Sequence, residues 1–453
     1  MIKRTLKQIQ KMVNGTGLEE RFENLIIEGV TIDSRAACDG NLYIPIIGAR
    51  VNGHTFAKNA MDSGAGGILW QQGEPNIPTD VPVIIVEHTK TALQQLAMAY
   101  KEELDMKIIG ITGSNGKTST KDILASILAT TYEVHKTPGN FNSEFGMPLT
   151  LLMAPGETEI AVLEMGMRGL GQIKLLSDMA KPDVSVITCI GEAHIEELGS
   201  RENISIAKFE ITSGLRKNGL FVYHGDEPLL VDRLAQVKPK FNLVTFGDHD
   251  HNDYYPTSIG VDGSGMVFTI PQSDLTFNLS VLGKHNVMNA LSAIAVARCF
   301  DVSFENIETG LQQVEMSKMR MEITHAKNGL MIIDDTYNSS PTSVRATLDL
   351  LYSLTGYAKK IVVLADMLEL GEHANHYHED IGAYLDPEQI DVLFTYGPLS
   401  KHTAHASKVP LTQHFDDKVQ LAKELDSLSS EKDVCLIKGS RGMALEDVIN
   451  ELK

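Results

Sequence analysis

The sequence predicts an α/β protein built from three domains. Its 453 residues exceed what one ordinary hydrophobic core organises, so two or three domains are expected. Continuous Val/Ile runs alternate with helical segments along most of the chain, which is typical of parallel sheets covered by helices on both faces. Near residue 250 the pattern changes to short alternating segments, which indicate a small antiparallel sheet.

The order of these segments places the domain boundaries. Residues 1–103 begin with a helix over residues 6–13 and continue through the helix and strand of "AKNAMDSGAGGIL" and "VPVIIVEHT". The polar helix "KTALQQLAMAYKEELDM" closes this first domain. We expect residues 104–317 to form the central domain and residues 318–453 to form the C-terminal domain.

Each of the two larger domains has its own run of strands. The central domain contains "KIIGIT", "EIAVLEM", "DVSVITCI" and "LFVYHGD", which predict a mostly parallel sheet. Its small antiparallel sheet comes from "GMVFTIPQ" and "TFNLSVLG", followed by the helix "NVMNALSAIAVARCF". The C-terminal domain contains "LMIIDDT", "KIVVLADM", "VLFTYG" and "DVCLIKG", each followed by helical sequence, which favours a Rossmann-like fold.

Composition and charge exclude several classes of protein. The formal net charge of −19 argues against a nucleic-acid binder, which needs a basic face, and no uncharged run approaches a membrane span. The N-terminal segment lacks the apolar core of a signal peptide. The cysteines are scattered without a CxxC pair, which suits a reducing compartment; they are Cys38, Cys189, Cys299 and Cys435. We expect a cytoplasmic protein.

The stretch "GITGSNGKTST" over residues 110–120 predicts a phosphate-binding loop. It departs from G-x-x-x-x-G-K-[ST], because Ile111 stands where the first Gly is usual. The strand before it and the amphipathic helix after it are nevertheless the context that a phosphate site needs, since amides at a helix start face the anion. The central domain is therefore a P-loop domain. Its expected nucleotide contacts are Thr112, Gly113, Ser114, Asn115, Gly116, Lys117, Thr118 and Ser119.

Further motifs follow the loop in order. They are "VLEMGMRG", "CIGEAHIEELGS", "IAKFEI", "GKHNVMNALSAIAVA", "KMRMEI" and "IIDDTYNSSPTSVRATLDLL". Together with T-G-x-x-G-K-T-[ST] they resemble the Mur ligase family of ATP-dependent enzymes that form amide bonds. The resemblance covers essentially the whole chain.

The resemblance implies a ligase reaction. ATP would phosphorylate a carboxylate to an acyl phosphate, an amine would attack it, and ADP and phosphate would be released. The stretches "GNFNSEFGMPLTLL", "DDTYNSSP" and "LADMLELGE" resemble the family members that join D-alanyl-D-alanine to UDP-N-acetylmuramoyl-tripeptide in peptidoglycan precursor synthesis. No nucleic acid or membrane is implied as a partner, and we expect a monomer.

The resemblance also assigns catalytic and metal-binding roles. Lys117 would contact the β- and γ-phosphates, and Thr118 with Glu164 would bind one Mg²⁺. His194 would bind a second Mg²⁺, although oxygen ligands are the usual choice of this ion. Lys208 would be carbamylated by CO₂, which converts its cation into an oxygen ligand for the second metal.

Nucleotide and substrate contacts are implied across all three domains. Arg320 would reach the γ-phosphate when the domains close, much as an arginine finger does. The remaining contacts to the nucleotide are expected from Asn286, Asn289, Asp335, Asn338 and Pro341. The first domain would bind the UDP-sugar and the C-terminal domain the dipeptide, and the substrate-binding residues are expected to be Ser34, Arg35, Gly48, Arg50, His54, Asn140, Asn142, Ser143, Ser440 and Arg441.

The motifs leave other functions open. The chain could be another amide ligase of the same fold, such as a ligase adding the third residue or a folylpolyglutamate synthase. It could also be a non-catalytic nucleotide-binding subunit or a kinase that releases a phosphorylated product. The third residue of the tripeptide, L-lysine or diaminopimelate, does not follow from the sequence.

Overall fold

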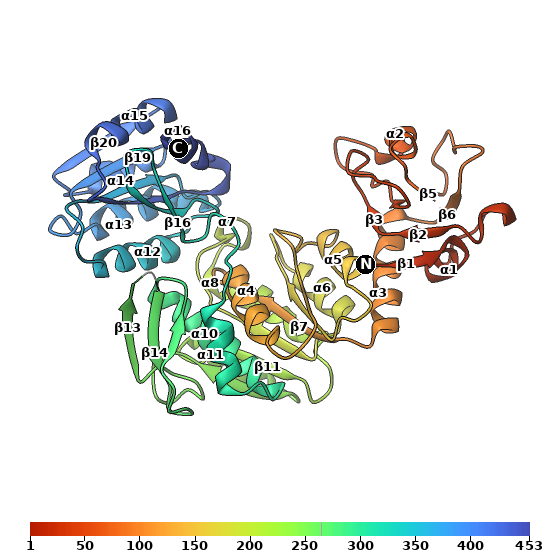
Figure 1. The fold of residues 1–453 in the computed structure, drawn as a ribbon, viewed down its shortest axis with the longest axis horizontal. Coiled ribbons are helices and arrows are strands. Elements are labelled where there is room, and N and C mark those ends of the chain that lie inside the picture. The colour runs from red at the N-terminus through yellow and green to blue at the C-terminus, as the bar shows by residue number, and fades with distance from the viewer. Residues whose placement is uncertain (264) are drawn as a thin grey trace.

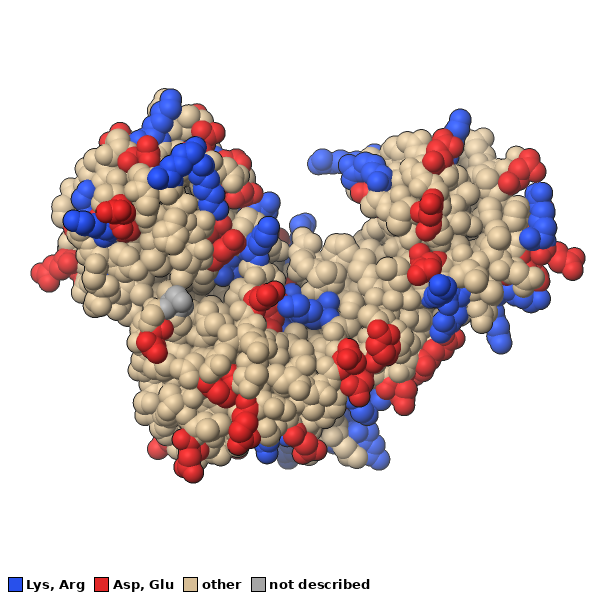
Figure 2. All heavy atoms as spheres, in the orientation of Figure 1, with Lys and Arg blue, Asp and Glu red and all other residues tan. Residues whose placement is uncertain are grey.

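The computed structural model describes residues 1–263 and 265–453. Three units follow one another along the chain and form an open U, in which the central unit joins the other two (Figure 1). Figure 2 shows the hollow between the first and the C-terminal unit. Lys and Arg side chains are scattered over the face shown there rather than gathered into one stripe. No helix of the described ranges is both long and apolar enough to cross a bilayer.

The first unit contains a parallel sheet of order β3-β4-β5-β6 and an antiparallel β1-β2 pair. The predicted first helix ends one residue early, at Met12. The unit packs on the central unit through α3 and α5, and the Ile2 amide donates to the Leu152 carbonyl at 2.7 Å. Its elements are β1 (Lys3–Thr5), α1 (Leu6–Met12), β2 (Ile26–Glu28), β3 (Val30–Thr31), β4 (Leu42–Tyr43), α2 (Ala57–Asp62), β5 (Gly67–Gln71), β6 (Val83–Val86) and α3 (Thr89–Leu104).

The central unit is built on a six-stranded parallel sheet of order β12-β11-β10-β7-β9-β8. Its strands are β7 (Lys107–Thr112), β8 (Val134–Lys136), β9 (Ile160–Glu164), β10 (Val184–Ile187), β11 (Leu220–His224) and β12 (Asn242–Phe246). Its helices are α4 (Lys117–Leu128), α5 (Gly146–Met153), α6 (Gln172–Ala180), α7 (Ile195–Leu198), α8 (Arg201–Phe209), α9 (Pro228–Val237), α10 (Lys284–Cys299) and α11 (Phe304–Gln312). Because β7 lies inside the sheet, its carboxyl end opens between the ends of β9 and β10.

The small antiparallel sheet has the order β13-β14-β15 and lies beside α10 and α11. Its strands are β13 (Ser258–Asp262), β14 (Gly265–Thr269) and β15 (Phe277–Leu279). Apolar side chains of β14 and β15 pack with α10 in one core, which includes Phe268, Phe277 and Leu291. The predicted combination of a mostly parallel sheet with a small antiparallel one is confirmed.

The C-terminal unit has a mixed sheet of order β16-β17-β21-β18-β19-β20. Five strands are parallel, and β16 pairs antiparallel with β17 at the edge, which the sequence pattern did not predict because β16 is short and half-exposed. The strands are β16 (Glu322–His325), β17 (Met331–Asp335), β18 (Lys360–Ala365), β19 (Val392–Tyr396), β20 (Leu411–Phe415) and β21 (Val434–Lys438). The helices are α12 (Pro341–Ser353), α13 (Ala374–Tyr384), α14 (Ser400–Ala406), α15 (Lys418–Leu428) and α16 (Glu446–Leu452).

A buried carboxylate anchors the connection between the central and C-terminal units. Asp122 on α4 accepts hydrogen bonds from the amide and the hydroxyl of Ser317, at 3.0 and 2.7 Å. Lys136 donates to the same carboxylate at 2.7 Å, and the Lys121 ammonium lies 3.4 Å away. The start of the C-terminal unit is therefore tied to the helix that follows the phosphate loop. The domain boundaries at residues 103 and 317 stay predictions.

Candidate active site

A cleft of about 990 Å³ lies between the central and C-terminal units. Its central wall is formed by the loop after β7 and by the carboxyl ends of β9, β10 and β11. Its opposite wall is formed by the segment after β17, the start of α12 and the end of β21. Ligands of open parallel sheets bind at such carboxyl ends, so this cleft is the candidate active site.

The phosphate loop joins β7 to α4 over residues 113–116. Gly116 has φ of +81°, and a Cβ there would lie 2.5 Å from Asn289 Oδ1. A Cβ on Gly113 would lie 1.8 Å from Thr188 Oγ1. Glycine is therefore required at both positions, because the loop backbone packs directly on its neighbours. The first turn of α4 presents backbone amides that have no intrahelical acceptor, which suits an anion.

Lys117 folds back over this loop. Its Nζ donates to the Gly113 carbonyl at 2.9 Å and lies 3.5 Å from the Ser114 carbonyl. Burial lowers the pKa of Lys117, Glu164 opposes that shift, and Arg320 adds to it. A phosphate anion would favour the charged ammonium, so Lys117 fits the predicted phosphate contact.

Glu164 and Thr118 form a pair of oxygen donors at the base of the cleft. Glu164 ends β9, is 2% exposed, and accepts from the Thr118 hydroxyl at 2.7 Å. Its other oxygen accepts from the Asn142 amide at 2.7 Å. A hydroxyl beside a carboxylate is the donor set that Mg²⁺ prefers, so these residues fit the predicted metal.

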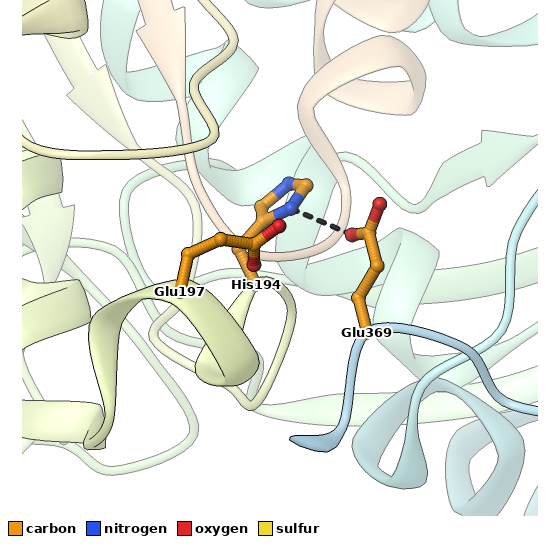
Figure 3. A group of neighbouring side chains, drawn as sticks. All are labelled: His194, Glu197 and Glu369. Carbon is orange, nitrogen blue, oxygen red and sulfur yellow. Dashed lines mark ion pairs between the residues drawn. The ribbon is translucent and has the colours of Figure 1, made fainter.

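His194 and Glu369 bring the two units together at the cleft. The residues shown in Figure 3 are His194 and Glu197 of the central unit and Glu369 of the C-terminal unit. His194 Nδ1 lies 2.7 Å from Glu369 Oε2. This pairing holds the pKa of Glu369 below its ordinary value. In this arrangement the imidazole predicted to bind metal is engaged by a carboxylate from the other side of the cleft.

Lys208 is a buried lysine on α8 that also lines the cleft. Its side chain is 1% exposed, and its Nζ forms no hydrogen bond or ion pair with the described residues. Burial is the largest cause that holds its pKa well below the ordinary value, and the nearby Lys117 lowers it further. The sequence pattern only mildly favoured burial at this position.

The C-terminal wall contributes a cation and a buried ion pair. The Arg320 guanidinium stacks 4.0 Å from the centroid of the Tyr337 ring, and both residues line the cleft. Lys438, at the end of β21, is 2% exposed and donates to Asp335 and, at 2.8 Å, to the Asn338 carbonyl. Lys438 thereby fixes the segment that was predicted to hold the ribose and adenine.

Direct hydrogen bonds connect the C-terminal wall of the cleft to the phosphate loop and to the segment after β10. The Ser340 hydroxyl donates to Asn115 Oδ1 at 3.3 Å. The Thr342 hydroxyl donates to Glu192 Oε2 at 2.6 Å. These contacts set the spacing between α12 and the phosphate loop.

Helix α10 places only one of its two predicted asparagines at the cleft. Asn289 lines the cleft, whereas Asn286 is 1% exposed and lies behind it. Asn286 donates to the Leu282 carbonyl at 2.8 Å and accepts from Asn289 Nδ2 at 3.0 Å. Asn286 thus orients Asn289, and a direct nucleotide contact by Asn286 stays a prediction.

The structure brings most, but not all, of the predicted residues together. Those lining the cleft are Ser114, Asn115, Gly116, Lys117, Thr118, Ser119, Asn140, Asn142, Ser143, Glu164, His194, Lys208, Asn289, Arg320, Asp335 and Asn338. Those outside its lining are Thr112, Gly113, Asn286, Pro341, Ser440, Arg441 and the five first-unit residues Ser34, Arg35, Gly48, Arg50 and His54.

Several of the residues outside the lining have local structural contacts. His54 is buried, stands edge-on to Trp70 with ring centroids 4.7 Å apart, and accepts from the Gln71 amide at 3.2 Å. Ser440 accepts from the Leu368 amide at 2.9 Å. A substrate role for these residues stays a prediction.

Two residues that sequence reasoning missed stand in the cleft. Lys438 was read as the end of a strand in "DVCLIKG", and Glu369 lies in the quoted stretch "LADMLELGE". Lys438 is the last residue of the apolar strand β21, and Glu369 lies shortly after the apolar strand β18, its parallel neighbour. A charged residue at the carboxyl end of such a strand is the signal that could have identified them.

The fold and the cleft define the class of the protein. A helix start that suits phosphate faces a cation supplied by a second domain, which is the arrangement of an enzyme that uses a nucleoside triphosphate. Sequence models match along the chain: "Mur ligase family, catalytic domain" over residues 26–101, "Mur ligase middle domain" over residues 111–297, and "Mur ligase, glutamate ligase domain" over residues 319–441.

Known proteins are similar to this chain over all or nearly all of its length. The UDP-N-acetylmuramoyl-tripeptide–D-alanyl-D-alanine ligase of Bacillus subtilis is 45% identical, covering 100% of this chain and 99% of the relative. MurF from Acinetobacter baumannii superposes with a TM-score of 0.90 at 29% identity, covering 100% and 99%. MurF ligase from Thermotoga maritima, solved in complex with ADP, gives 0.83 at 29% identity, covering 94% and 97%. The chain belongs to the Mur ligase family, as the motifs predicted.

Proposed function

We propose that this protein joins D-alanyl-D-alanine to the C-terminal carboxylate of UDP-N-acetylmuramoyl-tripeptide, with ATP converted to ADP and phosphate. The observation that carries the proposal is the convergence of Lys117, Glu164 and Arg320 on one cleft between two domains. The names of full-length relatives support the choice of substrates. The step belongs to peptidoglycan precursor synthesis, and we place it in the cytoplasm.

The reaction needs an activated carboxylate, because a carboxylate and an amine do not condense in water. The carboxylate oxygen attacks the γ-phosphorus of ATP, ADP leaves, and an acyl phosphate forms. The amine then attacks the acyl carbon, and phosphate departs as the amide bond forms and a proton is released. Lys117 and Arg320 act on the oxygens where charge accumulates, which is where electrostatic stabilisation is most effective.

Magnesium fits the oxygen donors on the central wall. Thr118 and Glu164 would hold one ion, which neutralises phosphate charge during transfer. Their separation of 2.7 Å and the burial of Glu164 keep the pair oriented before ligands arrive. A second ion would be held by His194 and a modified Lys208, after His194 parts from Glu369.

Carbamylation of Lys208 accounts for an otherwise costly residue. CO₂ adds to a neutral amine, which loses a proton and becomes a carbamate with two oxygens. The depressed pKa of Lys208 makes the neutral amine available, and the absence of a partner among the described residues leaves room for new contacts. A Lys208→Ala variant should lose activity and regain part of it with short carboxylic acids. Failure of every such acid to rescue would contradict the modification.

Substrate recognition requires the three units to approach one another. The UDP portion is assigned to the first unit and the dipeptide to the C-terminal unit, whereas ATP belongs at the loop between them. Closure would bring Ser34, Arg35 and Arg50 toward Asn140 and its neighbours. Scattering curves that stay unchanged on adding an ATP analogue with the UDP-tripeptide would contradict this account.

Phosphate release with a panel of amines tests the choice of substrates. We expect ADP and phosphate only when UDP-muramoyl tripeptide and D-alanyl-D-alanine are both present. Single D- or L-amino acids and folate substrates serve as controls for other ligases of the same fold. Turnover with one of those and none with D-alanyl-D-alanine would overturn the proposal, and turnover without any amine would indicate a kinase.

A further inference from the structure

A second cluster of histidines and carboxylates lies at the ends of β11 and β12. His224 is the last residue of β11 and Asp226 follows it, while Asp248, His249 and His251 lie after β12. The two strands are parallel neighbours, with His224 opposite Phe246 in the register. Their carboxyl ends therefore meet at one edge of the sheet, and the five side chains are brought together there.

Three of these residues present converging ligand atoms. One atom each of His224, Asp226 and Asp248 lies within 4.8 Å of the others. His224 Nδ1 is buried, has no hydrogen-bond partner among the described residues, and lies 3.9 Å from Asp226 Oδ2. Donors around a tetrahedral ion with bonds of about 2.0–2.2 Å are separated by about 3.3–3.6 Å, so the ligand atoms need to approach one another by at most about 1.5 Å.

Two further imidazoles flank the same carboxylate. His249 Nδ1 and His251 Nε2 each lie 3.1 Å from Asp226 Oδ1, and their rings stack 5.8 Å apart. Both side chains are more than half exposed, so they can rotate toward an ion from solvent. Asp248 is paired with Lys284 at 2.7 Å, a cation that a bound metal ion would replace.

Hydrogen bonds from the segment after β12 hold Asp226 in this position. Its carboxylate accepts from the Asp248 amide at 2.6 Å and from Asn252 Nδ2 at 2.9 Å. A Cβ on Gly247 would lie 2.3 Å from Asp226 Oδ2, and one on Gly225 would lie 2.0 Å from Asn252 Oδ1. The two glycines therefore let the loops close around the carboxylate, as a preformed ligand site requires.

We propose that His224, Asp226 and Asp248 form a binding site for a divalent transition-metal ion, completed by His249 or His251. Mixed imidazole and carboxylate donors suit Zn²⁺, Co²⁺ or Ni²⁺ better than Mg²⁺. His224 also lines the cleft that holds Thr118 and Glu164, but none of the three proposed ligands carries a step of the ligation described above.

Titration of the full chain with Zn²⁺ tests the site. Protein freed of metal and then saturated with Mg²⁺ should bind one equivalent of Zn²⁺ at this site by calorimetry. Asp248→Asn and His224→Gln should each weaken it by at least about tenfold, the loss expected even for a residue that only supports a metal ligand. Thermal unfolding with a chelator present checks that each variant is folded, and either folded variant carries the test.

Two control variants separate this site from other histidines. On α13, His376 Nε2 lies 3.6 Å from Asp380 Oδ2, and the His376 side chain is as exposed as that of His249. Because His376 is remote from the proposed site in the fold, His376→Ala should leave the Zn²⁺ affinity unchanged. His194→Ala should also leave it unchanged, because His194 belongs to the other His–carboxylate cluster. The proposal would be overturned if the wild type did not bind Zn²⁺ or if the Asp248→Asn and His224→Gln variants bound it as tightly as the wild type. Loss of binding in either control variant would also overturn it.

Discussion

Replacing Lys208 by methionine should stabilise the protein while abolishing ligation. The side chain is 1% exposed on α8, and its amine has no partner among the described residues. Methionine keeps an unbranched apolar stem of similar length and removes the amine. The substitution therefore removes a buried polar group without opening a large cavity, whereas the proposed carbamate can no longer form.

The expected gain follows from the cost of burying an amine that has no hydrogen-bond partner among the described residues and meets solvent only at the cleft. That cost is about 1–3 kcal/mol, which should appear as a higher free energy of unfolding of the central unit. For a domain of about 150–250 residues this corresponds to a rise in Tm of about 2–12 °C. Because the folded pKa of Lys208 lies below its unfolded value, wild-type stability rises with pH between the two values, and the advantage of methionine shrinks there.

Calorimetry in bicarbonate-free buffer without Mg²⁺ measures the effect. Lys101→Met is the matched control, because Lys101 is 3% exposed but donates to the Met179 and Ala180 carbonyls at 3.3 and 3.1 Å. Removing that partnered amine should lower the Tm. A Lys208→Met variant that melts below the wild type, or that ligates at the wild-type rate, would refute the reasoning.

Three further predictions concern the phosphate loop, the C-terminal wall of the cleft, and the buried carboxylate that connects the central and C-terminal units. Gly116→Ala should weaken ATP binding at least about tenfold in calorimetry. The alanine Cβ would meet Asn289, and the φ of +81° at this position would strain the backbone by about 1–3 kcal/mol. Unchanged affinity for ATP would contradict this. Lys438→Met should raise the KM for ATP more than it lowers kcat, because Asp335 loses its partner; kinetics with KM unaltered would count against it. Burial raises the pKa of Asp122, but its two lysine partners and Ser317 hold it, on balance, below the ordinary value. The stability that the Asp122 carboxylate supplies should therefore be present at neutral pH and lost in acid. In melting curves recorded across pH, Asp122→Asn should reduce the fall of Tm toward acid pH, and an unchanged fall would exclude this role.

Local patterns were sufficient to predict the phosphate loop and its surroundings. The strand, the glycines and the helix start of residues 107–128 are adjacent in sequence, so their geometry depends on short-range chemistry. Glu164 could be placed at the cleft because it ends an apolar strand in a parallel sheet. The same reasoning supplied the α/β class and the small antiparallel sheet.

Contacts between distant segments could not be predicted in this way. The pairing of His194 with Glu369 and the contact of Ser340 with Asn115 depend on how two domains dock, which no local pattern encodes. Lys438 gains its role only because β21 pairs beside β17, although 100 residues separate its amine from the Asn338 carbonyl. Likewise, the edge strand β16 is too short to carry a clear alternation.

The most direct test of the proposed chemistry follows the carboxylate oxygen. UDP-muramoyl tripeptide labelled with ¹⁸O in its terminal carboxylate is turned over with ATP and D-alanyl-D-alanine, and the released phosphate is analysed by mass spectrometry. Transfer of the phosphoryl group to the carboxylate predicts one ¹⁸O atom in each phosphate. Unlabelled phosphate, released with equal amounts of amide product, would contradict activation through an acyl phosphate.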